Sequence, residues 1–310
     1  MVEINEKLRA KAEEYMEANS ISKAALSSAI GVHRTSVSQY FTGNEEALTQ
    51  GTVDNIEEGL TVILGGTEPK AAQCCTQGTY RRAGIHQTDD TVGIIAVCQS
   101  CQDDMGLGIV VGKSGFGKTF TLKYYSRSPR VAYIECNEAM NARDLVKAIE
   151  KQIGLPHITG TINDRLDSIK AFFNTNTGYL LIIDEADKLI TRYAQKKAEI
   201  LRTIFDDSDV GMVLSGEPAL ENMIKQYIPR MANRIDLYWK LKGLKKTDVI
   251  SYIDGCGFDD AASEEMVRRA TNDKNGCFRL LDRTFRNVMR LAKDNITLDT
   301  VREASGMMLL

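Results

Sequence analysis

Short runs of apolar residues recur through the middle of the chain, and longer stretches in which apolar residues follow helical spacing separate them. Runs of this length that are apolar throughout are typical of strands buried on both faces of a parallel sheet. Strand and helix therefore alternate, which predicts an α/β domain with a parallel sheet and helices on both faces. The expected strands are Gly108–Val111, Val131–Cys136, Leu180–Asp184, Val210–Leu214 and Asp236–Trp239.

Helical patterns flank this α/β region on both sides. The N-terminal part is expected to be an all-α domain, and a polar stretch that opens with Gly65-Gly66 follows it as the best linker candidate. Helical spacing resumes after the last expected strand and predicts a small helical lid. The expected boundaries are 1–64 for the N-terminal domain, 65–90 for the linker, 91–245 for the α/β core and 246–310 for the lid.

Two short helices separated by a tight turn are predicted within the N-terminal domain, at residues 23–30 and 33–41. Ala25 is small enough to let the helices approach, Gly31 allows the turn, and Val37 fills the crossing. This spacing resembles the λ-repressor-like helix-turn-helix family, so the resemblance implies a DNA-binding domain.

The exposed positions of the second helix carry side chains that bond phosphates and base edges. We therefore expect them to face DNA. A small helical domain that binds another protein is the alternative, because it would use the same packing positions. The expected DNA-contacting residues are His33, Arg34, Thr35, Ser36 and Gln39.

The strongest chemical signal lies between the first expected strand and the helix after it. There the chain spells G-x-x-x-x-G-K-[ST], the pattern of a loop that binds the phosphates of a nucleoside triphosphate. Its glycines let backbone N–H groups curl around the phosphates. Lys118 can reach the β- and γ-phosphate oxygens, and the Thr119 hydroxyl can bind Mg²⁺. The expected ATP-binding loop is Gly112, Lys113, Ser114, Gly115, Phe116, Gly117, Lys118 and Thr119.

A second apolar strand ends in two acidic residues, Asp184 and Glu185. Asp184 is expected beside the phosphate loop as a second Mg²⁺ ligand, direct or through water. Glu185 is the candidate base that polarises the attacking water. The alternative is a core strand followed by a helix with acids in its first turn, which the helix dipole favours. The upstream phosphate loop makes the catalytic interpretation the preferred one.

Composition narrows the class of protein without naming a partner. The chain has 310 residues, 43% hydrophobic residues and a formal net charge of −3, which is typical of a soluble globular protein. Because the net charge is slightly negative, any contact with DNA must come from local basic patches. We find no run of 18 apolar residues and no signal-peptide core, so a cytoplasmic location in a bacterial host cell and no membrane partner are expected.

The sequence contains seven cysteines, and in a cytoplasmic protein they are expected to be reduced. Cys98 and Cys101 have the spacing of half a zinc site, but they fall in an apolar stretch with helical character. Cys74 and Cys75 are adjacent, an awkward pair of ligands. Structural zinc sites usually show two cleanly spaced pairs, so core packing is the preferred interpretation.

A sheet domain with a phosphate loop and a small helical lid resembles the AAA+ ATPases. The whole chain, in its length and domain order, resembles the Mu B-like family of phage transposition ATPases, with the TnsC-like and IstB-like families as neighbours. The resemblance implies an AAA+ fold preceded by a helix-turn-helix domain. The stretches that carry it most closely are Gly112–Thr119, Gly178–Leu189 and Val210–Glu217.

The resemblance also implies roles for several residues outside the phosphate loop. AAA+ proteins place a polar sensor after the fourth strand, and Ser215 and Glu217 are the candidates here. Arg234 matches the arginine finger that reaches a neighbouring subunit's γ-phosphate, with Arg230 as the alternative. Arg279 matches the lid arginine that senses the γ-phosphate. For each arginine, a surface ion pair is the competing interpretation.

Lysines gather where the last strand leads into the lid. In an assembled oligomer they could line a DNA-facing surface, where each phosphate contact adds to the salt dependence of binding. A solvated strand end explains them equally well. The lysines in question are Lys240, Lys242, Lys245 and Lys246.

Taken with the family resemblance, these features predict an ATPase that needs ATP and Mg²⁺ and binds duplex DNA largely without sequence preference. The resemblance further implies a helical filament on DNA that selects target DNA and stimulates a DDE transposase. Two alternatives stay open. One is a helix-turn-helix transcriptional regulator gated by ATP, and the other is an assembly or secretion ATPase whose N-terminal helices bind protein.

Overall fold

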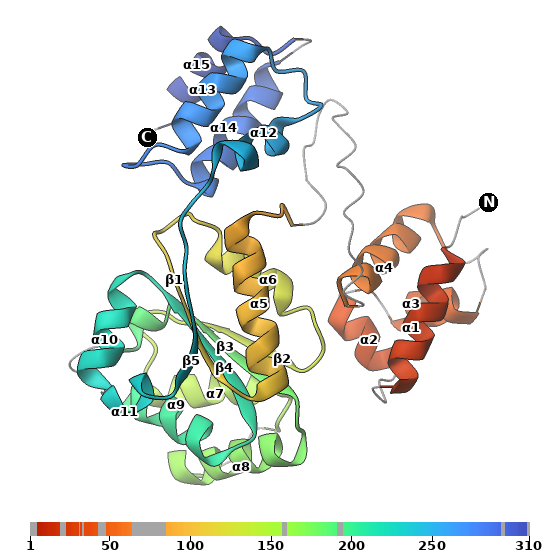
Figure 1. Cartoon of the computed structure of the whole chain (residues 1–310). Coiled ribbons are helices and arrows are strands. Elements are labelled where there is room, and N and C mark those ends of the chain that lie inside the picture. Colours follow the sequence, from red (N-terminus) through yellow and green to blue (C-terminus); the bar gives the residue numbers. More distant parts are fainter. Residues whose placement is uncertain are drawn as a thin grey trace. The chain divides into compact units, whose positions relative to one another are not determined.

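The computed structural model divides the chain into two compact units (Figure 1), one of residues 1–71 and 124–131 and the other of residues 72–123 and 132–310. It describes residues 5–18, 23–30, 32, 34–42, 48–63, 85–156, 160–190, 195–292 and 295–308.

The first unit is helical over most of its described residues up to residue 63. Its helices are α1 (Glu6–Ala18), α2 (Lys23–Ile30), α3 (Arg34–Thr42) and α4 (Gln50–Ile63). Val37, Tyr40 and Ile56 are fully buried in its small core. The phenol of Tyr40 donates to Glu57 of α4 at 3.1 Å, which ties α3 to α4. The helix pair α2 and α3 lies where the turn motif predicted it, although Gly31 and His33 fall outside the described residues.

A parallel sheet forms the centre of the second unit, with the strand order β2-β3-β4-β1-β5. The pairs β3–β4, β4–β1 and β1–β5 are all parallel. The predicted α/β class with a parallel sheet is therefore confirmed, and each expected strand exists within a residue or two of its predicted bounds. The strands are β1 (Leu107–Val111), β2 (Val131–Glu135), β3 (Tyr179–Asp184), β4 (Val210–Gly216) and β5 (Ile235–Lys240).

Helices cover both faces of this sheet. Alternate residues such as Leu181 and Ile183 of β3 join one large core with the apolar sides of several helices. On the other face α5 (Asp89–Asp104) lies so close to the sheet that only glycine fits at Gly108 and Gly211. The remaining helices of the α/β part are α6 (Lys118–Tyr125), α7 (Ala142–Gln152), α8 (Ile162–Thr175), the 3₁₀ turn η2 (Ala186–Lys188), α9 (Gln195–Asp207), α10 (Ala219–Tyr227) and α11 (Pro229–Ala232).

The lid is a helical group with a core of its own beyond the C-terminal end of β5, drawn in blue in Figure 1. Tyr252, Met266 and Phe285 are among its buried residues. A single bridge between Phe258 and Ile296 adds a strand-like contact. Its helices are α12 (Lys246–Ile253), α13 (Asp260–Ala270), α14 (Phe278–Leu291) and α15 (Leu298–Gly306). Over the described part of the chain, none of the helices has both the length and the apolar character needed to cross a membrane.

The predicted linker at 65–90 needs correction at its C-terminal end. Helix α5 begins at Asp89, and Thr88 caps it by accepting a hydrogen bond from the backbone of Thr91. Asp90 is buried, and its carboxylate accepts the backbone N–H groups of Lys242 at 3.0 Å and Gly243 at 2.8 Å. These polar residues therefore cap a helix and hold the joint between β5 and the lid. Residues 64–84 lie outside the described residues.

The close approach of α5 to the sheet predicts that Gly211 cannot be replaced. A Cβ atom at Gly211 would lie 2.0 Å from the Cys101 carbonyl oxygen, and a backbone atom has little room to move. We expect Gly211→Ala to lower the free energy of unfolding by about 1–3 kcal/mol in denaturant titration. Gly306→Ala, at the end of α15 where nothing lies within 4 Å, is the matched control and should show no loss. Equal stability of both variants would contradict the packing described here.

Candidate functional site

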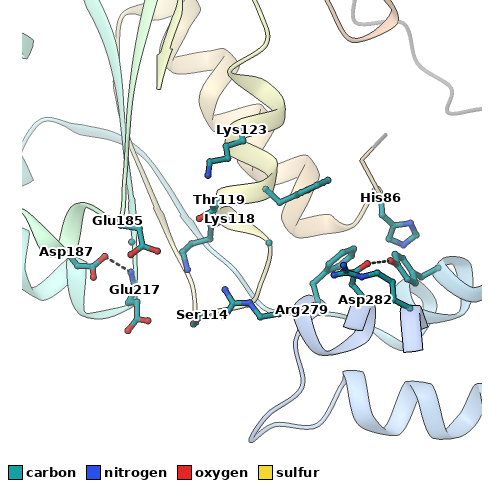
Figure 2. A pocket seen from close by; sticks show the side chains of 17 residues that line it. His86, Ser114, Lys118, Thr119, Lys123, Glu185, Asp187, Glu217, Arg279 and Asp282 are labelled. Atoms are coloured by element: carbon teal, nitrogen blue, oxygen red, sulfur yellow. Dashed lines mark hydrogen bonds and ion pairs between the residues drawn. The ribbon is translucent and has the colours of Figure 1, made fainter. Parts of the chain in front are cut away.

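The candidate site lies at the sheet edge where the parallel strands β1, β3 and β4 end, the usual place for ligands in such sheets. Because β4 lies between β1 and β3, the loops after all three strands converge there. A pocket of about 590 Å³ opens at this edge and extends to the lid. Figure 2 shows Lys118, Thr119 and Glu185 on its sheet side and Arg279 and Asp282 on its lid side.

The phosphate loop has the backbone that its glycines permit. Gly115 and Gly117 have φ values of 83° and 96°, in the left-handed region that favours glycine. Helix α6 then begins at Lys118, so the loop amides and the helix N-terminus face the same space. Of the predicted loop residues, those lining the pocket are Ser114, Gly115, Gly117, Lys118 and Thr119.

The other loop residues support the loop from outside the pocket. The backbone N–H of Gly112 donates to Gly216 at 3.2 Å, which joins the ends of β1 and β4. Lys113 is exposed, and its ammonium reaches the Asp273 carbonyl of the lid at 3.4 Å. The ring of Phe116 packs against Gly243.

Lys118 bends back over its own loop. Its ammonium donates to the carbonyls of Gly112 at 2.5 Å and Lys113 at 3.2 Å. Burial lowers the pKa of Lys118, while the carboxylates of Asp184 and Glu217 act in the opposite direction. A charged ammonium that is partly desolvated and held only by carbonyl oxygens is well prepared to bind an anionic phosphate.

Asp184 is fully buried at the end of β3, and both of its carboxylate oxygens accept hydrogen bonds. Oδ1 accepts the backbone N–H of Glu185 at 3.0 Å, and Oδ2 accepts the phenol O–H of Tyr133 at 2.9 Å. Burial and the nearby Asp184 charge raise the pKa of Tyr133. Sequence reasoning missed Tyr133, because only the pairing of β2 with β3 places it beside Asp184.

The donor set fits the metal that the sequence predicted. Thr119 lines the pocket, and Asp184 is the last residue of β3. Both offer oxygen atoms alone, the ligand type that Mg²⁺ prefers, and Mg²⁺ usually keeps several waters. Asp184 is fully buried and does not line the pocket. This favours the predicted indirect role, in which a water connects its carboxylate to the metal.

Glu185 follows Asp184 in a left-handed backbone conformation, with φ 56° and ψ 38°. Such a conformation is uncommon for residues other than glycine and aims the side chain into the pocket, which Glu185 lines. Its carboxylate forms an ion pair with Lys188 of η2. A carboxylate accepts about four hydrogen bonds, so positions stay available for a water beside the Lys188 ammonium.

The two sensor candidates lie in different environments. Ser215 is still inside β4, where it pairs with Val110, and it does not line the pocket. Its hydroxyl is buried and, within the described residues, has no hydrogen-bond partner. Glu217 lines the pocket, and its backbone N–H donates to Asp187 at 3.1 Å (Figure 2). Glu217 therefore lines the pocket, whereas Ser215 does not.

The lid reaches the phosphate loop through the start of α14. The backbone N–H of Arg279 donates to Gly115 at 3.0 Å, and its guanidinium donates to the Ser114 hydroxyl at 3.2 Å. Cys277 also lies against this loop, since a Cβ atom at Gly115 would be 2.9 Å from its sulfur. The structure thus brings the predicted lid arginine to the loop. Arg286, paired with Asp282, lines the same wall of the pocket.

The far end of the pocket is aromatic, which the sequence did not indicate. The ring of His86 contacts Tyr252 at 5.1 Å and Phe278 at 6.2 Å between centroids. His86 Nε2 lies 3.0 Å from the Asp248 carbonyl, which fixes the ring at the start of the lid. The pocket therefore has a polar end at the phosphate loop and an aromatic end that suits a flat ring.

The arginine-finger candidates lie away from this pocket. Arg234 precedes β5 and Arg230 lies in α11, so both are at the sheet edge opposite the phosphate loop, because β5 is parallel to β1. Arg234 is half-exposed and forms an ion pair with Asp206 of α9. Within one chain, neither arginine lines the pocket.

The candidate DNA-binding residues form two separate groups. The strand-end lysines are all exposed, and Lys245 forms an ion pair with Asp89. In the first unit Thr35 is exposed on α3, whereas Ser36 and Gln39 are half-buried. His33 and the side chain of Arg34 lie outside the described residues. The exposed lysines are Lys240, Lys242, Lys245 and Lys246.

The paired cysteines of the sequence are interior residues of α5. Cys98 and Cys101 are fully buried. Burial raises the pKa of the Cys98 thiol and raises that of Cys101 to about 12. In this structure the two thiols are therefore interior packing groups of α5.

Comparison with known proteins agrees with this architecture. Residues 101–224 match the family model of the AAA domain. A Staphylococcus aureus protein described as a potential ATP-binding protein is 22% identical over 235 residues, which cover 64% of this chain and 85% of that protein.

Solved structures from Aeropyrum pernix are also similar. The ORC2 protein in its ADP form is 18% identical over 69% of this chain and 67% of that chain, with a TM-score of 0.56. Its ADPNP-ADP complexes are 16% identical over 79% and 71%, with a TM-score of 0.59. The ORC1 protein in complex with DNA is 14% identical over 70% and 64%, with a TM-score of 0.54. The fold is that of the AAA+ P-loop ATPases, as predicted.

The contact between lid and loop predicts that a nucleotide protects Cys277. Its thiol is partly exposed and lies beside Gly115, so a bound triphosphate should slow its alkylation by iodoacetamide. Mass spectrometry of native protein with and without ATP would measure the rate at each cysteine. Cys256, partly exposed in the same lid and hydrogen-bonded through its sulfur to the Asp254 carbonyl at 3.5 Å, is the control and should react at the same rate in both samples. Equal protection of both thiols, or of neither, would contradict this placement of the ligand.

Proposed function

We propose that this protein is an Mg²⁺-dependent ATPase that oligomerises on duplex DNA in its ATP state and delivers that DNA to a transposase. The observation that carries the proposal is a phosphate loop, a candidate base and a lid arginine gathered around one pocket. The Mu B-like resemblance of the sequence supplies the biological role. The proposal has separate parts, and each has its own support.

ATP fits both ends of the pocket. The phosphate end offers the loop amides, Lys118 and Arg279, all of which bind phosphate oxygens. At the other end His86 and Tyr252 offer ring faces and edges for the adenine base. Bound Mg²⁺ would neutralise charge on the β- and γ-phosphate oxygens, held from the protein side by Thr119 and Asp184.

Hydrolysis requires a positioned water and stabilisation of the charge that develops on the transferred phosphoryl group. Glu185 lines the pocket and orients that water with the acceptor positions that Lys188 leaves open. Lys118 leaves its own loop carbonyls and donates to the β- and γ-phosphates. Arg279 moves from Ser114 to the γ-phosphate, so the lid follows the state of the nucleotide.

Arg234 is assigned to the active site of a neighbouring subunit. It lies at the sheet edge opposite its own phosphate loop, so it cannot serve its own ATP. A finger that acts in trans makes ATP a component of the subunit interface. Because such a contact joins two different surfaces, it propagates into a helical filament when it does not close into a ring.

DNA binding is supported by two local features. Four exposed lysines lie between the end of β5 and the start of α12, where they are available for phosphate contacts, and one of them, Lys245, is paired with Asp89. The α2–α3 pair has the order of a helix-turn-helix. The similar ORC1 protein was solved in complex with DNA. Because the net charge is −3, attraction to DNA phosphates must come from such local groups.

ATP is expected to increase the affinity for random-sequence duplex by at least about tenfold over ADP, because only the triphosphate assembles the interface. Fluorescence anisotropy with a labelled duplex and a non-hydrolysable ATP analogue measures the affinity. Electron microscopy of the same samples should show filaments on DNA with the analogue alone.

Discrete dimers at isolated sites would support the transcriptional regulator instead. Rings that form without DNA would support an assembly ATPase.

Glu185→Gln should keep the filaments, because the variant retains ATP binding and lacks the base. Its filaments should persist with ATP itself, whereas wild-type filaments disassemble as ATP is consumed.

Arg234→Ala is expected to lower the ATPase rate of the assembled protein on the order of 10³-fold, since the charge on the transferred phosphoryl group is then unopposed. A mixture of the Arg234→Ala and Lys118→Ala variants should recover part of the wild-type ATPase rate. In an equal random mixture, about a quarter of interfaces combine an intact pocket with an intact Arg234. Steady-state phosphate release measures this recovery.

The control for Arg234 is Asp206→Asn, which removes the ion pair seen within the subunit. If Arg234 acts only in that pair, Asp206→Asn should lower the rate as strongly as Arg234→Ala, and mixing should restore nothing. We expect instead that Asp206→Asn keeps most of the activity.

A further inference from the structure

We infer that Tyr133 is a positioning residue for the buried carboxylate that holds the metal. It donates its phenol O–H to Oδ2 of Asp184 at 2.9 Å and so fixes the rotation of that carboxylate. The inference rests on the nucleotide-binding and metal-binding parts of the proposed function and needs neither DNA nor a transposase.

The carboxylate of Asp184 has one internal bond on each oxygen. The backbone N–H of Glu185, the next residue, donates to Oδ1 at 3.0 Å. That bond alone leaves the carboxylate free to turn about its last torsion, since side-chain sp³–sp² torsions are broad. The Tyr133 hydroxyl supplies the second point. An ionised carboxylate accepts about four hydrogen bonds, so two acceptor positions stay available for a metal or its waters.

The sheet places the two side chains on the same face. Ala132 and Ile134 of β2 and Ile183 of β3 all belong to the large core. Residues alternate between the faces of a strand, so Tyr133 and Asp184 both point to the opposite face. Because β2 neighbours β3 in the sheet, the phenol can reach the carboxylate.

Tyr133 is itself held by the helix that follows the phosphate loop. The ammonium of Lys123 lies 5.7 Å from the centroid of the Tyr133 ring, within cation–π range. The same ammonium pairs with Glu135 of β2 at 2.6 Å. Lys123 belongs to α6, whose first residues are Lys118 and Thr119. One chain of contacts therefore connects the helix of the phosphate loop to the carboxylate of β3.

A purely structural role for Tyr133 makes a different prediction. As a packing residue, it would be replaced by phenylalanine without effect on the metal. As a positioning residue, it loses only the hydroxyl in Tyr133→Phe, and the ring stays beside Lys123. The dependence of nucleotide binding on Mg²⁺ therefore distinguishes the two roles, without a measurement of hydrolysis.

The experiment is the binding of a fluorescent ADP analogue by the full-length protein, first in EDTA and then along an Mg²⁺ titration. For Tyr133→Phe we expect metal-free affinity within about twofold of wild type, because the loop amides and Lys118 are intact. The Mg²⁺ concentration at half-effect should rise about tenfold, as for other residues that orient a metal ligand. Thermal unfolding of each variant accompanies the titration.

Tyr238→Phe is the matched control. The Tyr238 phenol also donates to a carboxylate at 2.9 Å, that of Glu221, but neither residue lines the pocket. This variant should match wild type at every Mg²⁺ concentration. In an Asp184→Asn background, which removes the carboxylate charge, Tyr133→Phe should add no further change, because its effect passes through Asp184.

An unchanged Mg²⁺ half-point in Tyr133→Phe would overturn the inference. A loss of metal-free affinity as large as the shift in the Mg²⁺ half-point would also overturn it. So would a lower unfolding temperature of Tyr133→Phe, if the same shift in the Mg²⁺ half-point also appears in the Asp184→Asn background. Either result would mean a structural role. The wild-type arm tests the proposed function separately. Wild-type protein that binds no ADP, or binds it without regard to Mg²⁺, would overturn the proposed function and this inference with it.

Discussion

The site depends on the burial of charge at one edge of a parallel sheet. Asp184 is fully buried, and the Lys118 ammonium is partly desolvated nearby. Burying a charge is costly unless it is paired or hydrogen-bonded. Here both groups are held by backbone atoms and by Tyr133, and neither forms a direct ion pair with the other among the described residues. They are therefore fixed in place while their charges remain available to a phosphate and a metal.

A second organising feature is the attachment of the lid to the core, which includes contacts at the phosphate loop and at the start of α5. Arg279, in the first turn of α14, donates to the phosphate loop, and Asp90, at the start of α5, holds the backbone after β5. Burial raises the pKa of Asp90, against the lowering effect of the two backbone N–H groups. One attachment touches the ligand site and the other does not.

Much of the site could be predicted because its signals are local. The phosphate loop needs glycines at fixed spacing, and Gly115 and Gly117 have the positive φ values that explain them. Asp184 and Glu185 follow an apolar run whose length gave the strand. Other features depended on non-local pairing. The linker prediction ended too late because Thr88, Asp89 and Asp90 are polar, although a cap and first-turn acids are also the signal of a helix start. Ser215 was predicted as a sensor from its position, and the structure places it inside β4 beside Val110, outside the pocket lining.

By itself, the sequence determined the chemistry of the loop, the α/β class and the order of the domains, because backbone conformation and hydrophobic spacing are encoded by neighbouring residues. Only the tertiary structure decided which side chains meet. The order β2-β3-β4-β1-β5 brings Tyr133 to Asp184 and carries Arg234 to the far edge. Lid packing brings His86 to Tyr252 and to its neighbour Ser251. His86 and Ser251 are 165 residues apart in the sequence. Such meetings follow from strand order and helix packing over the whole unit, which no local pattern contains.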